Sequence, residues 1–176
     1  MEEQTLLELI RTHEESEIIE YKENNANPDR IGKYISALGN GALMTHTPYA
    51  YLVWGVKDVT KELVGTTFNP ELAKASANSK NKMPLITFLD KFVDPRLSLD
   101  WSSFNINSKT IVCLVINVTF IKRPISFKGT KYIISGSSVE DLNMFPEKER
   151  ILWNSFKSSK FELEIAKRDL TLDEVR

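Results

Sequence analysis

The sequence predicts a single α/β domain in which a mixed β-sheet is flanked by helices. Segments with apolar residues at helical spacing alternate along the chain with short, strongly apolar segments typical of strands. The segment 49–56, Tyr-Ala-Tyr-Leu-Val-Trp-Gly-Val, is apolar on both faces and therefore predicts a central strand. The chain has 176 residues, of which 41% are hydrophobic and 27% charged, so it is long enough for one domain with a substantial core.

The N-terminal third predicts helices and strands in alternation. Residues 5–13 place apolar side chains at helical spacing, and residues 15–23 follow with the composition of a strand. A helix is expected from about residue 29 to 43, because Pro28 suits the first turn and apolar residues recur along one face. The Gly-Asn-Gly sequence at 39–41 is interpreted as its C-cap, since no Gly-Lys-Ser/Thr follows that would make it a phosphate-binding loop.

The remainder of the chain predicts strands with helices between and after them. Helical segments are expected at 69–78 and 84–92, and a β-hairpin is expected from strands at 97–106 and 110–120. A last strand at 131–135 precedes a helix that begins near Phe145. We therefore divide the chain into a domain at 1–145 and a C-terminal helical segment at 146–176.

The end of the chain carries the sequence Thr-Leu-Asp-Glu at 171–174, which is a capping box and predicts the start of another helix. Only two residues follow it. We therefore expect this chain to be the N-terminal module of a longer protein.

Composition narrows the class of protein. A net charge of −1 and a pI near 6.2 give no global attraction to nucleic acid or membranes, so any nucleic-acid site must be a local patch. The single cysteine, Cys113, permits no internal disulfide, and with two histidines it disfavours a structural zinc site. The acidic N-terminus and the lack of a long apolar run predict a cytoplasmic protein without a membrane partner. Cys113, Trp54, Trp101 and Trp153 are expected in the core.

Three carboxylates form the first candidate site: Glu15, Glu20 and Asp58. Glu20 is expected on a strand, and Asp58 follows the next strand along the chain. Glu15 would reach them only if the chain bends near Ser16, because residues five apart on a strand point to opposite faces. Converging carboxylates hold Mg²⁺ or Mn²⁺, which can activate water against a phosphodiester. The alternative interpretation is a solvated strand edge with an aspartate in a turn.

Cations form the second candidate site. A stretch without acidic residues carries Lys122, Arg123, Lys128 and Lys131, with Phe127 and Tyr132 interleaved. This composition favours contact with a phosphate backbone, with the aromatic rings stacking on bases. Lys22 would contact a phosphate or pair with Glu20. The alternative is that these cations only protect an exposed sheet edge.

Taken together, several short motifs resemble the Schlafen-type, Alba-like DNA-binding domain. They are found, in this order and spacing, at 15–22, 37–40, 51–58, 64–66, 132–137 and 145–153. In bacteria this domain forms the N-terminal part of transcriptional regulators, RecG-like helicase-related proteins and divergent AAA-type ATP-binding proteins. One departure from relatives is Ile134, where an arginine is usual.

The resemblance implies an α/β fold and nucleic-acid binding, of DNA or RNA, as the default function. It also implies an alternative, because a related domain in vertebrate Schlafen proteins is a metal-dependent endoribonuclease whose acidic triad falls on Glu15, Glu20 and Asp58. A third interpretation is a dimerisation module in which sheet edges pair two copies. For the first two functions we expect the acids and the cations to lie at the rim of one shared groove.

Overall fold

The structure is a computed structural model, and it describes residues 1–78 and 81–157. The capping box at 171–174 lies outside the described residues, as do Ser79 and Lys80. The described elements are, in chain order, α1 (Glu3–Thr12), β1 (Ile19–Lys22), α2 (Pro28–Met44), β2 (Tyr49–Trp54), β3 (Lys74–Asn78), β4 (Asn81–Pro84), α3 (Leu85–Phe92), β5 (Val93–Asp94), β6 (Ser98–Ile106), β7 (Lys109–Asn117), β8 (Ser126–Phe127), β9 (Thr130–Ser135), β10 (Ser138–Asp141), the 3-10 helix η1 (Leu142–Met144) and a helical segment at 146–157.

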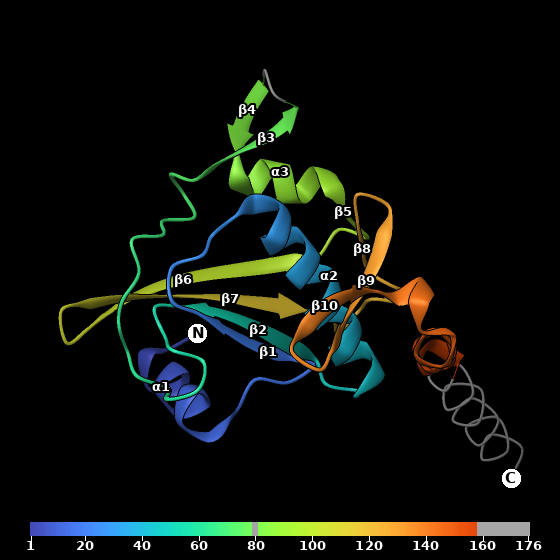
Figure 1. The fold of residues 1–176 in the computed structure, drawn as a ribbon, viewed down its shortest axis with the longest axis horizontal. Coiled ribbons are helices and arrows are strands. Elements are labelled where there is room, and N and C mark those ends of the chain that lie inside the picture. The colour runs from blue at the N-terminus through green and yellow to red at the C-terminus, as the bar shows by residue number, and fades with distance from the viewer. Residues whose placement is uncertain (79–80, 158–176) are drawn as a thin grey trace, which may run out of the picture.

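The predicted mixed sheet is confirmed. Its strand order is β1-β2-β7-β6, with β1 parallel to β2 and the other neighbours antiparallel. The β6–β7 hairpin turns through Asn107 and Ser108, which both have positive φ, as a tight hairpin turn requires. This hairpin forms the long pair of strands in Figure 1.

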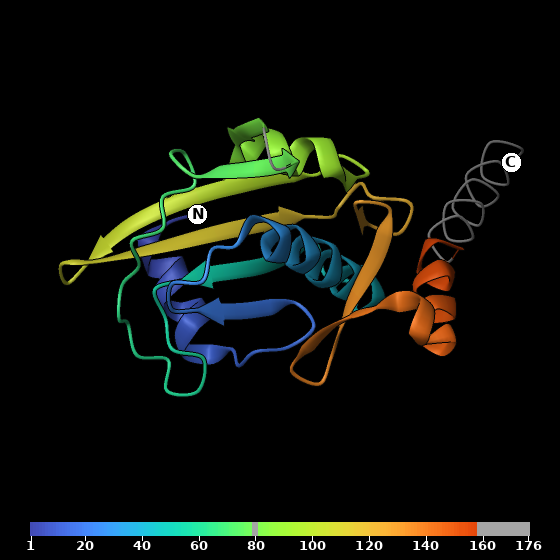
Figure 2. The same ribbon diagram turned by 45° about the horizontal axis from the view of Figure 1, so that its top comes forward.

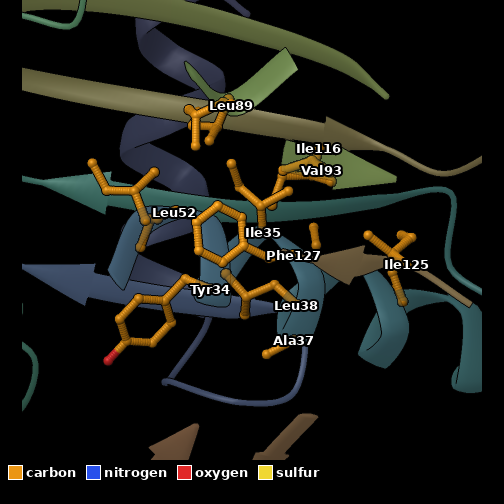
Figure 3. Packing of buried hydrophobic residues seen from close by; sticks show 14 of the residues in the cluster. Tyr34, Ile35, Ala37, Leu38, Leu52, Leu89, Val93, Ile116, Ile125 and Phe127 are labelled. Carbon is orange, nitrogen blue, oxygen red and sulfur yellow. The ribbon is translucent and has the colours of Figure 1, made fainter. Parts of the chain in front are cut away.

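Both faces of this sheet are buried, because successive side chains of a strand point to opposite faces. On one face Leu6 and Ile10 of α1 pack with Tyr21, Val53 and Cys113. On the other face α2 packs its apolar side chains on the sheet, among them Ile35 and Leu38 on Leu52 and Ile116 (Figure 3). The central-strand prediction for β2 is therefore confirmed.

A second, antiparallel sheet with the order β10-β9-β8-β5 covers the other side of α2. Figure 2 shows α2 between this sheet and the β1-β2-β7-β6 sheet. As a result twelve of its seventeen residues are buried, including Ser36 and Asn40. Ser36 Oγ donates to Ile125 O at 2.7 Å and accepts from Tyr132 N at 3.0 Å, which joins the helix to β9.

Three predictions of secondary structure are wrong. The strand predicted at 131–135 is present as β9 but is not the last strand, because β10 follows it at Ser138–Asp141. Residues 69–78 are not helical, because the turn that Asn69 caps ends at Ala73 and β3 begins at Lys74. The Gly-Asn-Gly sequence at 39–41 is not a C-cap, because α2 continues to Met44. Small residues are needed there for close packing: a Cβ on Gly41 would collide with the carbonyl oxygen of Glu17.

The prediction of core tryptophans is confirmed for Trp54, which is fully buried, and wrong for Trp153, whose side chain is 46% exposed. Trp101 is partly buried and packs against the core cluster of α2. Cys113 is buried on β7 as expected, and burial raises the pKa of its thiol to about 12. No helix in the described part of the chain is long and apolar enough to cross a membrane.

Candidate nucleic-acid interface

Two adjoining surface depressions, of about 610 and 190 Å³, share Asp94, Ser126 and Gly129. We call the pair the Asp94 groove. The larger depression is also lined by Lys91, Phe92 and Lys128, and the smaller one by Arg123, Pro124, Lys131 and Trp153. The β5, β8 and β9 strands of the second sheet therefore bring together Arg123, Lys128 and Lys131, three of the cations proposed from the sequence.

Each of these three cations has a carboxylate partner. Arg123 donates two hydrogen bonds to Asp94, at 2.6 and 2.7 Å, and this pairing raises the pKa of Arg123. Lys128 pairs with Asp29 at 2.6 Å, and Lys131 pairs with Glu149 at 2.6 Å. The attraction of the groove for a phosphate is reduced by these acids, because the ligand must compete with them.

Lys128 is held in place by its surroundings as well as by its charge. It stands in the β8–β9 turn with a positive φ of 50°, and its backbone N–H donates to Phe92 O at 2.9 Å. Its Nζ lies 5.2 to 5.5 Å from the ring centroids of Phe88, Phe92 and Phe127. Phe127 itself is 1% exposed and packs against Gly32, so its ring cannot stack on a base as the sequence suggested.

The other predicted cations do not line the Asp94 groove. Lys122 lines a separate depression of about 580 Å³ that also includes Pro48. Lys22 is on β1, where it faces α2, with its Nζ 4.9 Å from the ring centroid of Tyr34. One face of the Tyr132 ring is covered by Lys33, whose Nζ lies 5.5 Å from the ring centroid.

The acids Glu15 and Glu20 are each engaged by neighbouring groups. Glu20 is 6% exposed and forms an ion pair with Lys22. Burial opposes the charge of Lys22, but its contacts with Glu20 and with the Tyr34 hydroxyl outweigh burial and raise its pKa. Glu15 Oε1 accepts a hydrogen bond from Tyr21 N at 3.0 Å.

Asp58 is close enough to Glu15 to affect its ionisation. Burial raises the pKa of Glu15 most, and the negative charges of Glu20 and Asp58 raise it further. The bend that the sequence required near Ser16 is present: Ser16 N donates to Ile19 O at 3.0 Å, which forms a tight turn before β1. Glu15 is therefore within electrostatic range of both Glu20 and Asp58.

The arrangement of the acids does not fit a metal ion. In residues 1–78 and 81–157, no three Asp, Glu, His or Cys side chains are grouped closely enough to hold one. Asp58 Oδ1 is instead occupied by Val59 N, at 2.7 Å. The expected shared groove is also not formed, because the depressions lined by Arg123, Lys128 and Lys131 include none of the three acids.

Two residues of the Asp94 groove, Lys91 and Trp153, were not predicted from the sequence. Lys91 is the basic residue in the last turn of α3, and it forms no ion pair with any described residue. Trp153 follows Leu152, the fully buried position of the helical segment 146–157. Neighbours in a helix point about 100° apart, so burial of Leu152 turns Trp153 away from the core.

A family model described as "Schlafen, AlbA_2" matches residues 15–143, which is more than half of the chain. The chain belongs to the Schlafen AlbA_2 family. The matched part of this Schlafen AlbA_2 chain contains the three acids and the cations Arg123, Lys128 and Lys131, and it ends before Trp153. No curated protein matches the chain.

Proposed function

We propose that this Schlafen AlbA_2 chain is a nucleic-acid-binding module, as in a regulator or helicase-related protein, and that the Asp94 groove is its contact surface. The observation that carries the proposal is the convergence of Arg123, Lys128 and Lys131, together with Lys91, around one groove. Family membership supports it, because the family resemblance implies nucleic-acid binding.

The cations would contact phosphates and would give no base specificity. If Arg123, Lys128 and Lys131 each neutralise one phosphate of a duplex, the logarithm of the binding constant falls with the logarithm of salt concentration at a slope of about −3. Each cation must give up its carboxylate partner, Asp94, Asp29 or Glu149, before it can contact a phosphate. The affinity for nucleic acid is therefore expected to be moderate at low salt and weak at physiological salt.

The experiment is a fluorescence-anisotropy titration of labelled 20-mer oligonucleotides, single-stranded and duplex, at low salt. The test variant is Arg123→Ala/Lys131→Ala, which leaves the structurally engaged Lys128 in place. The matched control is Lys57→Ala/Lys109→Ala, which removes the same charge from outside the groove. The groove variant is expected to bind roughly tenfold more weakly, equivalent to about 1.4 kcal/mol, and the control within about twofold of the wild type. Absence of wild-type binding to either oligonucleotide would contradict the proposal.

The alternative function, metal-dependent RNA cleavage by Glu15, Glu20 and Asp58, is supported by one observation, that Glu15 is within electrostatic range of the other two acids. It lacks a formed set of metal ligands within the described residues. We therefore propose binding as the function. Pairing of two copies through a sheet edge, at β1 or β6, stays a separate prediction that light scattering of the purified chain decides.

A further inference from the structure

Trp153 is an exposed aromatic side chain at the wall of the Asp94 groove. Its side chain is 46% exposed, and it lines the smaller depression together with Arg123 and Lys131. Among the exposed aromatic residues in the described part of the chain, Trp153 lines the groove, whereas Phe120 and Tyr49 do not.

The indole ring is held in a defined position. The Nζ of Lys131 lies 5.8 Å from its centroid, and the ring of Phe156 meets it edge-to-face at 6.1 Å. Glu149 is also close by, since its pKa is lowered by its hydrogen bond with Lys131 and, to a smaller extent, by Trp153. A ring fixed by its neighbours loses little conformational freedom when a planar ligand stacks on it.

The charges of the smaller depression indicate that stacking adds to phosphate attraction as a source of affinity there. Arg123 is paired with Asp94, and Lys131 with Glu149, so the two cations are balanced by two carboxylates. Stacking needs no net charge, and it accepts every base because each base has a π-face. The bases of a duplex are already stacked on each other, so only an unpaired base can reach an indole in this way.

We propose that Trp153 is a stacking platform for an unpaired nucleobase, and that the chain consequently prefers single-stranded nucleic acid to duplex. This inference rests on the proposed function and names the substrate class of the same groove. Arg123 and Lys131, which line the same depression as the indole, would contact the phosphates next to the stacked base.

The test uses the 176-residue chain with a labelled oligo(dT) 12-mer and a duplex of equal length. Wild type is expected to bind the single strand at least about fivefold more tightly than the duplex. Trp153→Ala should weaken single-strand binding roughly fivefold to a hundredfold, the range expected for one stacked base, and should weaken duplex binding much less. Trp153→Phe retains a ring and should stay within a few fold of wild type. Phe120→Ala, a control at an aromatic residue that is 86% exposed, should change neither affinity.

A second readout is intrinsic tryptophan fluorescence. Trp54 is fully buried and Trp101 partly buried, so oligo(dT) should quench the fluorescence of Trp153 alone. Trp153→Phe should therefore abolish the quenching while the anisotropy titration still reports binding. If Trp153→Phe binds oligo(dT) without quenching, the result supports direct stacking on Trp153. A folding defect would instead abolish the binding as well.

The outcomes separate this inference from the function on which it rests. If wild type binds oligonucleotides but both Trp153 variants bind and quench like wild type, the stacking inference is overturned and nucleic-acid binding stands. Equal binding of single strand and duplex by wild type also overturns it. If wild type binds neither oligonucleotide at low salt, both proposals fail together.

Discussion

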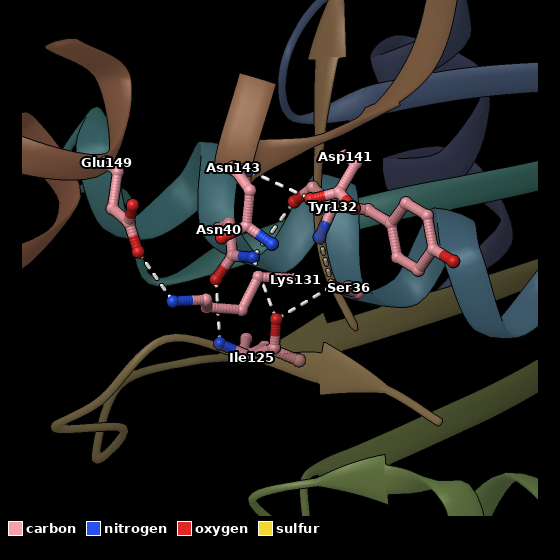
Figure 4. Close-up of polar contacts among 8 residues, drawn as sticks. All are labelled: Ser36, Asn40, Ile125, Lys131, Tyr132, Asp141, Asn143 and Glu149. Atoms are coloured by element: carbon pink, nitrogen blue, oxygen red, sulfur yellow. Dashed lines mark hydrogen bonds and ion pairs between the residues drawn. The ribbon is translucent and has the colours of Figure 1, made fainter. Parts of the chain in front are cut away.

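Asn40 and Ile125 exchange two hydrogen bonds between α2 and the segment that leads into the second sheet. Ile125 N donates to Asn40 Oδ1 at 2.8 Å, and Asn40 Nδ2 donates to Ile125 O at 2.9 Å. The same Nδ2 also donates to Tyr132 O at 2.9 Å (Figure 4). Asn40 is fully buried, so its side chain connects α2 to the strands that carry the Asp94 groove without leaving a hydrogen of the amide unpaired.

Replacing Asn40 with alanine is expected to lower the free energy of unfolding by about 2–5 kcal/mol. The substitution leaves Ile125 N–H and Tyr132 C=O without the Asn40 amide, whereas Ile125 O keeps its hydrogen bond from Ser36 Oγ. Each buried group that loses its partner costs about 1–3 kcal/mol. Urea unfolding at 25 °C measures the change. Asn143→Ala, at an exposed position, is the control and should stay within about 0.5 kcal/mol of wild type. A loss below about 1 kcal/mol for Asn40→Ala would show that water replaces the amide.

Gly41→Ala is expected to destabilise the protein, although alanine in a helix interior normally stabilises by about 1 kcal/mol relative to glycine. Gly41 is buried, and an added Cβ would collide with Glu17 O in the segment before β1. Either this segment or α2 must move, so a loss of about 1–3 kcal/mol is expected. The comparison is Lys33→Ala, at an exposed position of the same helix, by thermal unfolding. An increase in the melting temperature of Gly41→Ala would refute the close approach.

Glu15→Gln is expected to stabilise the protein at neutral pH. Burial, with the nearby charges of Glu20 and Asp58, raises the pKa of Glu15 in the folded state. Folding therefore favours the protonated carboxyl, and wild type loses stability as pH rises from the unfolded-state value, about 4, through the raised pKa. Glutamine cannot ionise, and its Oε1 can still accept from Tyr21 N.

The advantage of Glu15→Gln should consequently be absent below about pH 4 and fully present at pH 7. Urea unfolding at a series of pH values measures it, with Glu17→Gln, at an exposed position, as the control. An advantage of the same size at pH 3 and pH 7 would mean that ionisation of Glu15 is not its cause.

Local pattern was sufficient to predict α2, β2 and the β6–β7 hairpin, because their periodicity and turn residues act within one segment. It predicted β9 but not the rest of the second sheet, since β5 and β8 are two residues long and their paired residues are 32 and 34 positions apart in sequence. Contacts with distant segments also explain why Gly39 to Gly41 was mistaken for a C-cap. A helix with sheets on both sides needs small residues in its interior, and that need is invisible in the helix sequence alone.

For the candidate site, sequence analysis identified Arg123, Lys128 and Lys131 because they are close together in the chain. It could not anticipate that Asp94, Asp29 and Glu149 would pair with them, because those acids lie at least 18 residues away in sequence from their partners. It placed Trp153 in the core because tryptophan is usually well buried. Exposure of Trp153 depends on where the helical segment 146–157 meets β9, which is a tertiary property.

Millimolar Mn²⁺ is expected to leave the melting temperature of the chain unchanged within about 1 °C, because a ligand stabilises the folded state only when its concentration approaches its Kd. Glu20 is paired with Lys22 and Asp58 Oδ1 with Val59 N, so a metal ion would have to displace these partners. Thermal unfolding with and without Mn²⁺ measures the effect, and incubation with structured RNA and Mn²⁺ should give equal background cleavage for wild type and Glu20→Ala. A rise of several degrees in wild type that disappears in Glu20→Ala, together with Mn²⁺-dependent cleavage by wild type alone, would establish the acids as a metal site and the chain as a nuclease.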